Sequence, residues 1–151
     1  MKAWICSELA GPNALNWQEQ ATPEPGKGEV RVAIKAASLN FPDLLIVQGK
    51  YQMRPPLPFV PGAEFAGVVE AVGEGVKHLS VGSHVAGFAG TGGFGTHTVA
   101  PAALLMPLPP AFSFAEAVRR LYGAPSCCGR GRGMPLCCGP LPAPDARRPA
   151  T

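Results

Sequence analysis

The sequence predicts a mainly β, antiparallel or barrel-like domain with a few short helices over residues 1–117, followed by an irregular tail. Apolar residues of the first part recur in short runs of strand length, and glycines and prolines separate these runs. The composition changes abruptly after Ala117, where arginine, glycine, proline and cysteine predominate. A chain of 151 residues lies within the usual size of one domain, so a single folded domain is expected.

Two strands are predicted in the first 38 residues. Residues 2–7 (KAWICS) have strand length, and Cys6 within them is interpreted as a reduced, small apolar residue. Residues 29–38 alternate between aliphatic side chains on one face and basic side chains on the other. The aliphatic residues are Val30, Val32 and Ile34, and the basic ones are Arg31 and Lys35. Residues 22–29 (TPEPGKGE) contain turn-forming residues and predict a loop that joins the two strands.

A short helix and a long extended connection are expected next. Residues 41–51 (FPDLLIVQGKY) predict one helix that begins near Pro42 and ends at Gly49. Four prolines in residues 55–61 then require an extended connection, because proline cannot donate to a hydrogen-bonded ladder. A strand over residues 64–73 (EFAGVVEAVG) follows this connection.

The next segment predicts two short strands, an extended piece and the start of a helix. The strands cover residues 81–89 and 94–101 around a glycine-rich turn, and residues 104–110 are extended. Ser113 can cap the backbone amide near Glu116, whose carboxylate can reach back to Ser113, as in a capping box.

The segment Gly90–Gly95 (GTGGFG) matches the spacing of a dinucleotide-binding loop, and Glu116 lies at a suitable distance downstream. Such a loop must open a helix that holds the pyrophosphate at its N-terminus. The residues that follow are β-branched and interrupted by prolines, so a hairpin turn is the preferred interpretation.

The tail, residues 118–151, is a low-complexity sequence. It contains six arginines and one acidic residue, whereas residues 1–117 contain seven lysines and arginines against nine acidic residues. The net charge of +3 therefore comes from the tail, and no nucleic-acid partner is predicted from it. The adjacent pairs Cys127–Cys128 and Cys137–Cys138 lack the spacing of zinc ligands, so a disordered, thiol-rich tail is expected.

No membrane segment or secretion signal is predicted. The N-terminus is interrupted by Ser7 and Glu8 before it reaches the length of a signal-peptide core. The uncharged stretch Ser83–Ala115 contains too many prolines and glycines to form a continuous helix. A cytoplasmic location follows as an expectation. The histidines (His78, His84 and His97) show no metal-binding spacing and are expected on strands or on the surface.

The order of these segments resembles a known family. Four parts of the sequence together resemble the N-terminal domain of the medium-chain dehydrogenase/reductase superfamily. They are the opening strands, residues 36–76 (AASLNFPDLLIVQGKYQMRPPLPFVPGAEFAGVVEAVGEGV), VGSHVAGF, and GGFGTHTVAPAALLMPLPPAFSFAEA. Within it they are most similar to the zinc-independent NADPH:quinone oxidoreductases. The resemblance covers residues 1–117 and implies a GroES-like β-barrel.

The resemblance also bears on metal binding. In zinc-dependent relatives a cysteine ligand lies where this sequence has Asn40, and a histidine ligand lies where it has Ala63. No cysteine occurs between Cys6 and Cys127, so the lobe that holds a structural zinc is missing as well. The resemblance therefore implies that no zinc is bound, and that hydrogen bonds polarise the substrate carbonyl.

The implied activity is hydride transfer from NADPH to a quinone or a conjugated enone. Such an acceptor spreads the incoming charge over its own conjugated system. By resemblance, Asn40, Asp43 and Tyr51 line the cleft beside the nicotinamide and form the candidate catalytic site. Asn40 would offer amide donors, Tyr51 a hydroxyl, and Asp43 would order the local network. Helix capping by Asn40, helix-start stabilisation by Asp43 and simple packing of Tyr51 are the alternative roles.

The resemblance further implies a Rossmann domain that binds NADPH and is expected to start after residue 117. Residues 118–151 do not show the strand, glycine-rich loop and helix of such a domain. One hypothesis is that the tail is an out-of-frame translation. Without that domain, the chain alone is expected to show no NADPH-dependent turnover, and its exposed apolar domain face is expected to self-associate. A GroES-like assembly module without catalytic activity and a truncated fragment without function are the alternatives.

Overall fold

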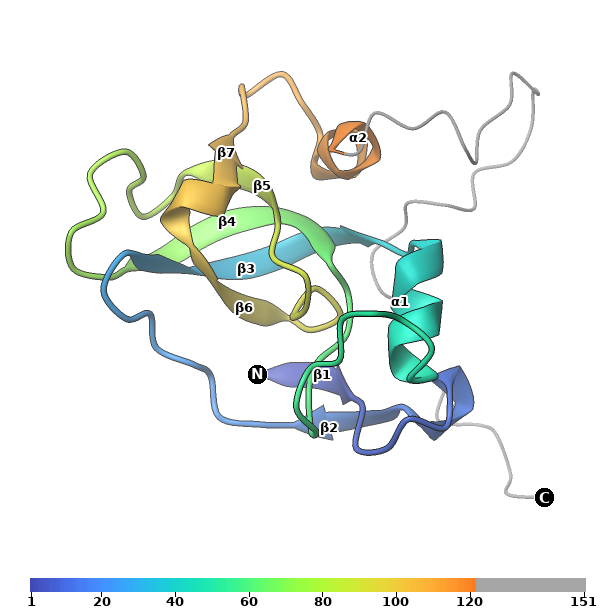
Figure 1. Cartoon of the computed structure of the whole chain (residues 1–151). Helices are drawn as coiled ribbons and strands as arrows, with labels where there is room; N and C mark the ends of the chain where they lie inside the picture. The colour runs from blue at the N-terminus through green and yellow to red at the C-terminus, as the bar shows by residue number, and fades with distance from the viewer. Residues whose placement is uncertain (122–151) are drawn as a thin grey trace, which may run out of the picture.

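The computed structural model describes residues 1–121, which form a mainly β domain with short helices (Figure 1). The predictions for residues 122–151, namely the irregular tail and its cysteine pairs, lie outside the described residues. The strands are β1 (Lys2–Ile5), β2 (Asn16–Glu19), β3 (Glu29–Ser38), β4 (Glu64–Val72), β5 (His84–Phe88), β6 (His97–Pro101) and β7 (Leu105–Pro107). The helices are α1 (Phe41–Val47) and α2 (Phe114–Arg120), with 3-10 turns η1 (Pro12–Ala14) and η2 (Ala102–Leu104).

The main sheet is antiparallel, has the order β6-β3-β4-β5-β7, and closes into a barrel. In a flat sheet of five strands the two edges would lie about 19 Å apart, at about 4.8 Å per step. The edge strands β6 and β7 are nevertheless joined by the three residues of η2, which rise only about 6 Å. The sheet therefore curls until its edges meet at η2 (Figure 1). The ring of His78 lies against this closure, with Nε2 3.0 Å from the carbonyl oxygen of Ala102.

The interior of the barrel holds the larger hydrophobic cluster. The alternation predicted for residues 29–38 is confirmed for Val30 and Val32, which are fully buried in this cluster. Ile34 is partly buried and packs against the same cluster, as predicted. Phe65 and Val85 supply the facing side chains from β4 and β5. A barrel this small is filled by its own side chains, so any ligand must bind at its end or outside it.

The outer face of the sheet is covered by α2 (Figure 1). Small side chains of the sheet, Ala36, Ala66 and Ala86, let the helix pack closely through Ala117 and Val118. The predicted capping box is confirmed, since Ser113 Oγ accepts the backbone N–H of Glu116 at 3.3 Å and Ser113 N–H donates to the Glu116 carboxylate at 3.1 Å. The helix continues past residue 117, and Val118 is as buried as the core.

Two features of the fold were not predicted correctly. Strand β2 was not expected, because its sequence NWQE has a single apolar residue and takes its structure from pairing with β1. The glycine-rich segment 90–95 does not form a hairpin turn, because β5 and β6 are not neighbours in the sheet. It crosses instead beside β1, where Phe94 O accepts the N–H of Trp4 at 2.9 Å and Gly95 forms a β-bridge with Ala3. A strand follows it, as expected, rather than a helix.

Candidate ligand-binding site

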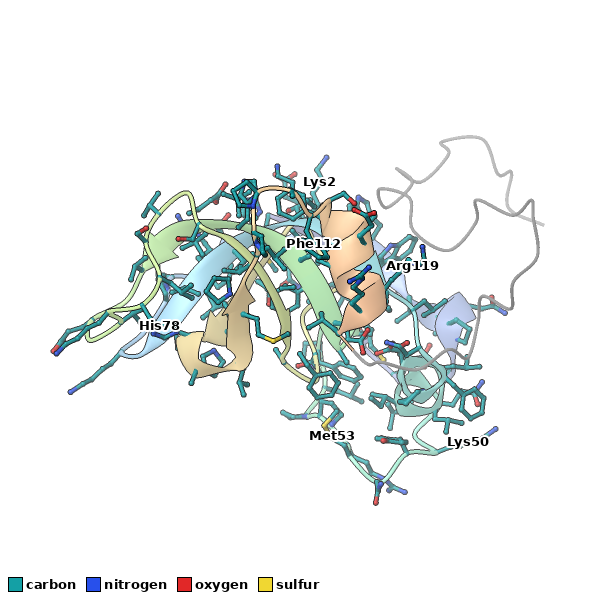
Figure 2. The ribbon with its side chains drawn as sticks, turned by 90° about the horizontal axis from the view of Figure 1, so that it is seen from above. Lys2, Lys50, Met53, His78, Phe112 and Arg119 are labelled. Carbon is teal, nitrogen blue, oxygen red and sulfur yellow. The ribbon has the colours of Figure 1, made fainter. Side chains whose placement is uncertain are left out.

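A cavity of about 270 Å³ opens at the end of the barrel beside α1. It is bounded by α1 and the loop after it, by the start of β4 and by the end of β5. Figure 2 shows Met53, which lines this cavity, on the side of the barrel away from His78. The lining residues are Asn40, Pro42, Asp43, Ile46, Tyr51, Met53, Ala63, Glu64, Phe88 and Gly90.

The sheet register builds one wall of the cavity. Ser38, the last residue of β3, lies opposite Glu64, the first residue of β4, and Glu64 lies opposite Phe88, the last residue of β5. The three residues form one row across the sheet at the point where the strands end. A carboxyl, a hydroxyl and an aromatic ring are therefore brought together by strand pairing from positions far apart in the sequence.

Helix α1 places Asp43 at the second wall. The short helix begins right after Asn40, which has extended backbone and precedes Pro42 in the first turn. Asp43 is 2% exposed, and its carboxylate accepts two backbone hydrogen bonds, from Asn40 N–H at 2.8 Å and from Ala63 N–H at 3.1 Å. One buried side chain thus ties the start of α1 to the segment that leads into β4.

Burial raises the pKa of Asp43, because an apolar surrounding disfavours the ionised carboxylate. The hydrogen bonds from Asn40 and Ala63 oppose this rise in pKa, and the nearby Glu64 adds to it. Since both carboxylate oxygens are already bonded to the backbone, this geometry supports the ordering role named for Asp43 in the sequence analysis.

The segment before β4 needs glycine at position 62. Gly62 has φ of +95°, and a β-carbon there would collide with the ring of Phe94 from the glycine-rich crossing. This close packing lies next to Ala63, which lines the cavity. The glycine at position 62 thus allows residues 90–95 to pack against the segment that contributes Ala63 to the cavity wall.

A chain of hydrogen bonds connects Asn40 to Glu64. The amide Nδ2 of Asn40 donates to Ser38 Oγ at 3.1 Å, and Ser38 Oγ–H donates to Glu64 Oε2. Glu64 is 2% exposed, and its carboxyl lines the cavity. Asn40 and Glu64 are therefore parts of one polar network on the cavity wall.

Tyr51 and the apolar residues complete the lining. Tyr51 lies in the loop after α1 and is partly buried. Within residues 1–121 its hydroxyl forms no hydrogen bond, so this hydroxyl is available to a ligand. Ile46, Met53 and Phe88 provide apolar surface opposite the polar network. This arrangement can hold a flat apolar ring while a few polar groups orient its oxygen atoms.

The charge of the cavity limits the ligands it can take. Two carboxyl groups, Asp43 and Glu64, line it, and none of its lining residues within the described chain is lysine, arginine or histidine. Phosphates are usually held by cations or by free N–H groups at helix ends, and Asp43 already occupies the start of α1. The cavity lining therefore offers no group suited to hold the phosphates of a dinucleotide.

Potential metal ligands are scattered in the described part of the chain. Residues 1–121 contain no group of three or more His, Cys, Asp or Glu side chains placed to hold a metal ion. The histidines have other contacts: His84 packs on Phe114 with ring centres 4.8 Å apart, and His97 Nε2 lies 3.2 Å from the Glu70 carboxylate. The absence of zinc stays a prediction.

The structure brings all three predicted site residues, Asn40, Asp43 and Tyr51, to the same cavity. Sequence reasoning missed Ser38 and Glu64. A signal was present for Glu64, because it is a charged residue at the head of an otherwise apolar run, EFAGVV. No comparable signal marked Ser38, whose role depends on the register between β3 and β4.

Comparison with known proteins identifies the family of this chain. Residues 26–110 match the family of alcohol dehydrogenase GroES-like domains. The quinone oxidoreductase-like protein 2 homolog of Nematostella vectensis is 40% identical over 117 residues, covering 77% of this chain and 32% of that protein. The chain therefore belongs to the family of alcohol dehydrogenase GroES-like domains, and its homologues are quinone oxidoreductase-like members of the medium-chain dehydrogenase/reductase superfamily.

Solved structures show the same similarity. The human synaptic vesicle membrane protein VAT-1 homolog-like protein superposes with a TM-score of 0.75 at 36% identity, covering 78% of this chain and 38% of that chain. The quinone oxidoreductase of Thermus thermophilus, also solved in complex with NADPH, gives a TM-score of 0.66 at 36% identity, covering 78% of this chain and 36% of that chain. The chain thus spans about a third of the length of the relatives it matches. No helix in residues 1–121 is long and apolar enough to cross a membrane.

Proposed function

We propose that this domain is the substrate-binding half of an oxidoreductase that transfers hydride from NADPH to a quinone or a conjugated enone. The observation that carries the proposal is the cavity that Asn40, Tyr51 and Glu64 line together with apolar side chains. The proposal is also supported by relatives that are named quinone oxidoreductases.

The size and polarity of the cavity favour this ligand class. An engineered apolar cavity of about 150 Å³ admits benzene. A cavity of about 270 Å³ therefore has room for a substituted ring of the size of a small quinone. Its two carboxyl groups disfavour anionic ligands, whereas a neutral carbonyl compound carries no charge to be repelled.

The residues of this chain would bind and orient the acceptor. The hydroxyl of Tyr51 and the amide of Asn40 would donate hydrogen bonds to the carbonyl oxygens, on which negative charge develops as hydride arrives. Ile46, Met53 and Phe88 would hold the ring and exclude water from it. The dinucleotide must be held by other groups, since the cavity residues do not fit its phosphates.

Binding of the acceptor can be tested without any turnover. Duroquinone is a suitable probe because its ring is fully substituted and does not add to thiols. We expect duroquinone to shift the backbone amide NMR signals of Asn40, Ala63 and Phe88, and to leave those around His78 unchanged. N40A and Y51F are each expected to weaken binding by about 2–10-fold, the value of one hydrogen bond. A wild-type protein whose cavity signals do not respond to saturating duroquinone would contradict the proposal.

Catalysis by this chain alone is a separate question. Holding donor and acceptor in reactive geometry contributes about 7–11 kcal/mol in well-aligned reactions. Because the residues that line the cavity offer no site for the NADPH phosphates, we expect no measurable NADPH oxidation when the purified 151-residue chain is mixed with duroquinone. A sustained decrease in NADPH absorbance above the protein-free control would show that the chain binds the cofactor after all.

A further inference from the structure

The hydrogen-bond chain from Asn40 to Glu64 has a direction, and this direction determines which atoms of Asn40 are left for a ligand. A carboxylate can only accept hydrogen bonds. Ser38 Oγ must therefore donate its single proton to Glu64 Oε2. With its proton used, Ser38 Oγ can only accept from Asn40, which requires the amide nitrogen Nδ2 to face it.

The orientation of the Asn40 amide follows from this order. An asparagine side chain is nearly symmetric in shape, so packing alone distinguishes poorly between its oxygen and its nitrogen. The serine and the carboxylate make the distinction together with the capping box of α1, in which the Asn40 side chain faces the backbone N–H of Asp43. The opposite orientation would bring Asn40 Oδ1 against an oxygen that has no proton to give. Nδ2 carries two protons, and Ser38 takes only one of them.

We propose that Ser38 and Glu64 are positioning residues, which hold the Asn40 amide so that its second Nδ2 proton is offered to the carbonyl oxygen of a bound quinone or enone. The proposal rests on the proposed function for the identity of the ligand, but the orientation itself is a property of the free protein. It assigns a role to two residues that are linked by the pairing of β3 with β4.

The burial of the network strengthens this effect. Glu64 is almost fully buried, and a hydrogen bond in such surroundings is stronger than in water. The bonds are also arranged head to tail, so each one polarises the next. No lysine, arginine or histidine among the cavity-lining residues of the described chain competes for the Glu64 carboxylate. Asp43, the other carboxyl group of the cavity, is occupied by backbone N–H groups.

The test follows the Asn40 side-chain amide by ¹H–¹⁵N NMR in the full 151-residue chain, with N40A to assign its two proton signals. E64Q keeps the shape of Glu64 but can donate as well as accept, so it no longer directs the Ser38 proton. We expect E64Q and S38A to move the Asn40 amide signals and to weaken duroquinone binding by about 2–10-fold, the value of one hydrogen bond. S38T, which keeps the hydroxyl, is expected to restore both.

The matched control is E70Q, on the same strand but exposed and outside the cavity, which is expected to change neither readout. Unchanged Asn40 amide signals in E64Q would overturn the proposal, whatever happens to ligand binding. A wild-type protein that does not bind duroquinone would instead overturn the proposed function, while the amide signals of the free variants would still decide whether the network orients Asn40.

Discussion

Replacing Asp43 by alanine tests the physical basis of the site, because this side chain holds two segments of the cavity together. The substitution leaves the buried N–H of Ala63 without an acceptor, which costs about 1–3 kcal/mol. It also removes the acceptor for Asn40 N–H at the start of α1, which is worth about 1 kcal/mol. D43A is therefore expected to lower the free energy of unfolding by about 2–4 kcal/mol, a large part of the stability of about 5–15 kcal/mol typical of a domain.

The measurement is urea unfolding followed by the fluorescence of Trp4 and Trp17, whose rings lie 5.4 Å apart in the paired strands β1 and β2. With a slope of about 1–3 kcal/mol per molar urea, the midpoint should fall by about 1–2 M. E74A, which removes an exposed carboxylate from a turn, is the control and should change the free energy by less than about 0.5 kcal/mol. A D43A midpoint equal to that of E74A would refute the role of Asp43 in joining α1 to the start of β4.

The pH dependence of the same position adds a second check. The pKa of Asp43 is raised in the folded state, so the folded protein binds the proton more tightly than the unfolded chain. The contribution of Asp43 to the free energy of unfolding is therefore fully present below the ordinary pKa of aspartate. It decreases as the pH rises through the pKa that Asp43 has in the folded protein. D43N cannot ionise, so the advantage of the wild type over D43N should be larger near about pH 4 than near about pH 7. A difference in stability between the wild type and D43N that grows with pH would contradict the conclusion that burial has the dominant effect on the pKa of Asp43.

Two further predictions concern the surface and the backbone. Leu39 and Phe41 lie on either side of Asn40 and are 76% and 71% exposed. A L39S/F41S double variant should therefore reduce any concentration-dependent self-association measured by sedimentation velocity. V81S, at a similarly exposed but isolated position, is the control and should not reduce it. G62A should lower the free energy of unfolding in urea by more than G75A does. Both glycines have positive φ, but an added β-carbon collides with a neighbour only at Gly62. Equal losses of unfolding free energy, each of about 1–3 kcal/mol, would indicate backbone strain alone.

Much of the local structure could be predicted from sequence. Strand β3 runs from Glu29 to Ser38 as predicted, because its alternation of aliphatic and polar side chains is a period-2 signal that depends on neighbouring residues only. The capping box at Ser113 is confirmed for the same reason, since its donors and acceptors lie within four residues. Strand β2 was missed because its residues carry little signal of their own and are stabilised by a partner strand.

The candidate site could be predicted only in part. Asn40, Asp43 and Tyr51 were named through a resemblance, and the structure places them around one cavity, while their catalytic roles stay a proposal. The bond from Asp43 to Ala63 spans 20 residues of sequence, and the bond from Ser38 to Glu64 spans 26. Neither could be read from local patterns, because each depends on how separate segments are brought together.

The sequence by itself determined where most strands and helices of the first 121 residues form, since hydrophobic periodicity, prolines, glycines and capping residues act over a few residues. Only the tertiary structure decided that the strand ends carrying Ser38, Glu64 and Phe88 form one row, and that the glycine-rich crossing supports Ala63 instead of turning a hairpin. The physical reason is that strand register and barrel closure are settled by contacts between distant segments, whose combined burial and hydrogen bonding exceed the preferences of any one of them.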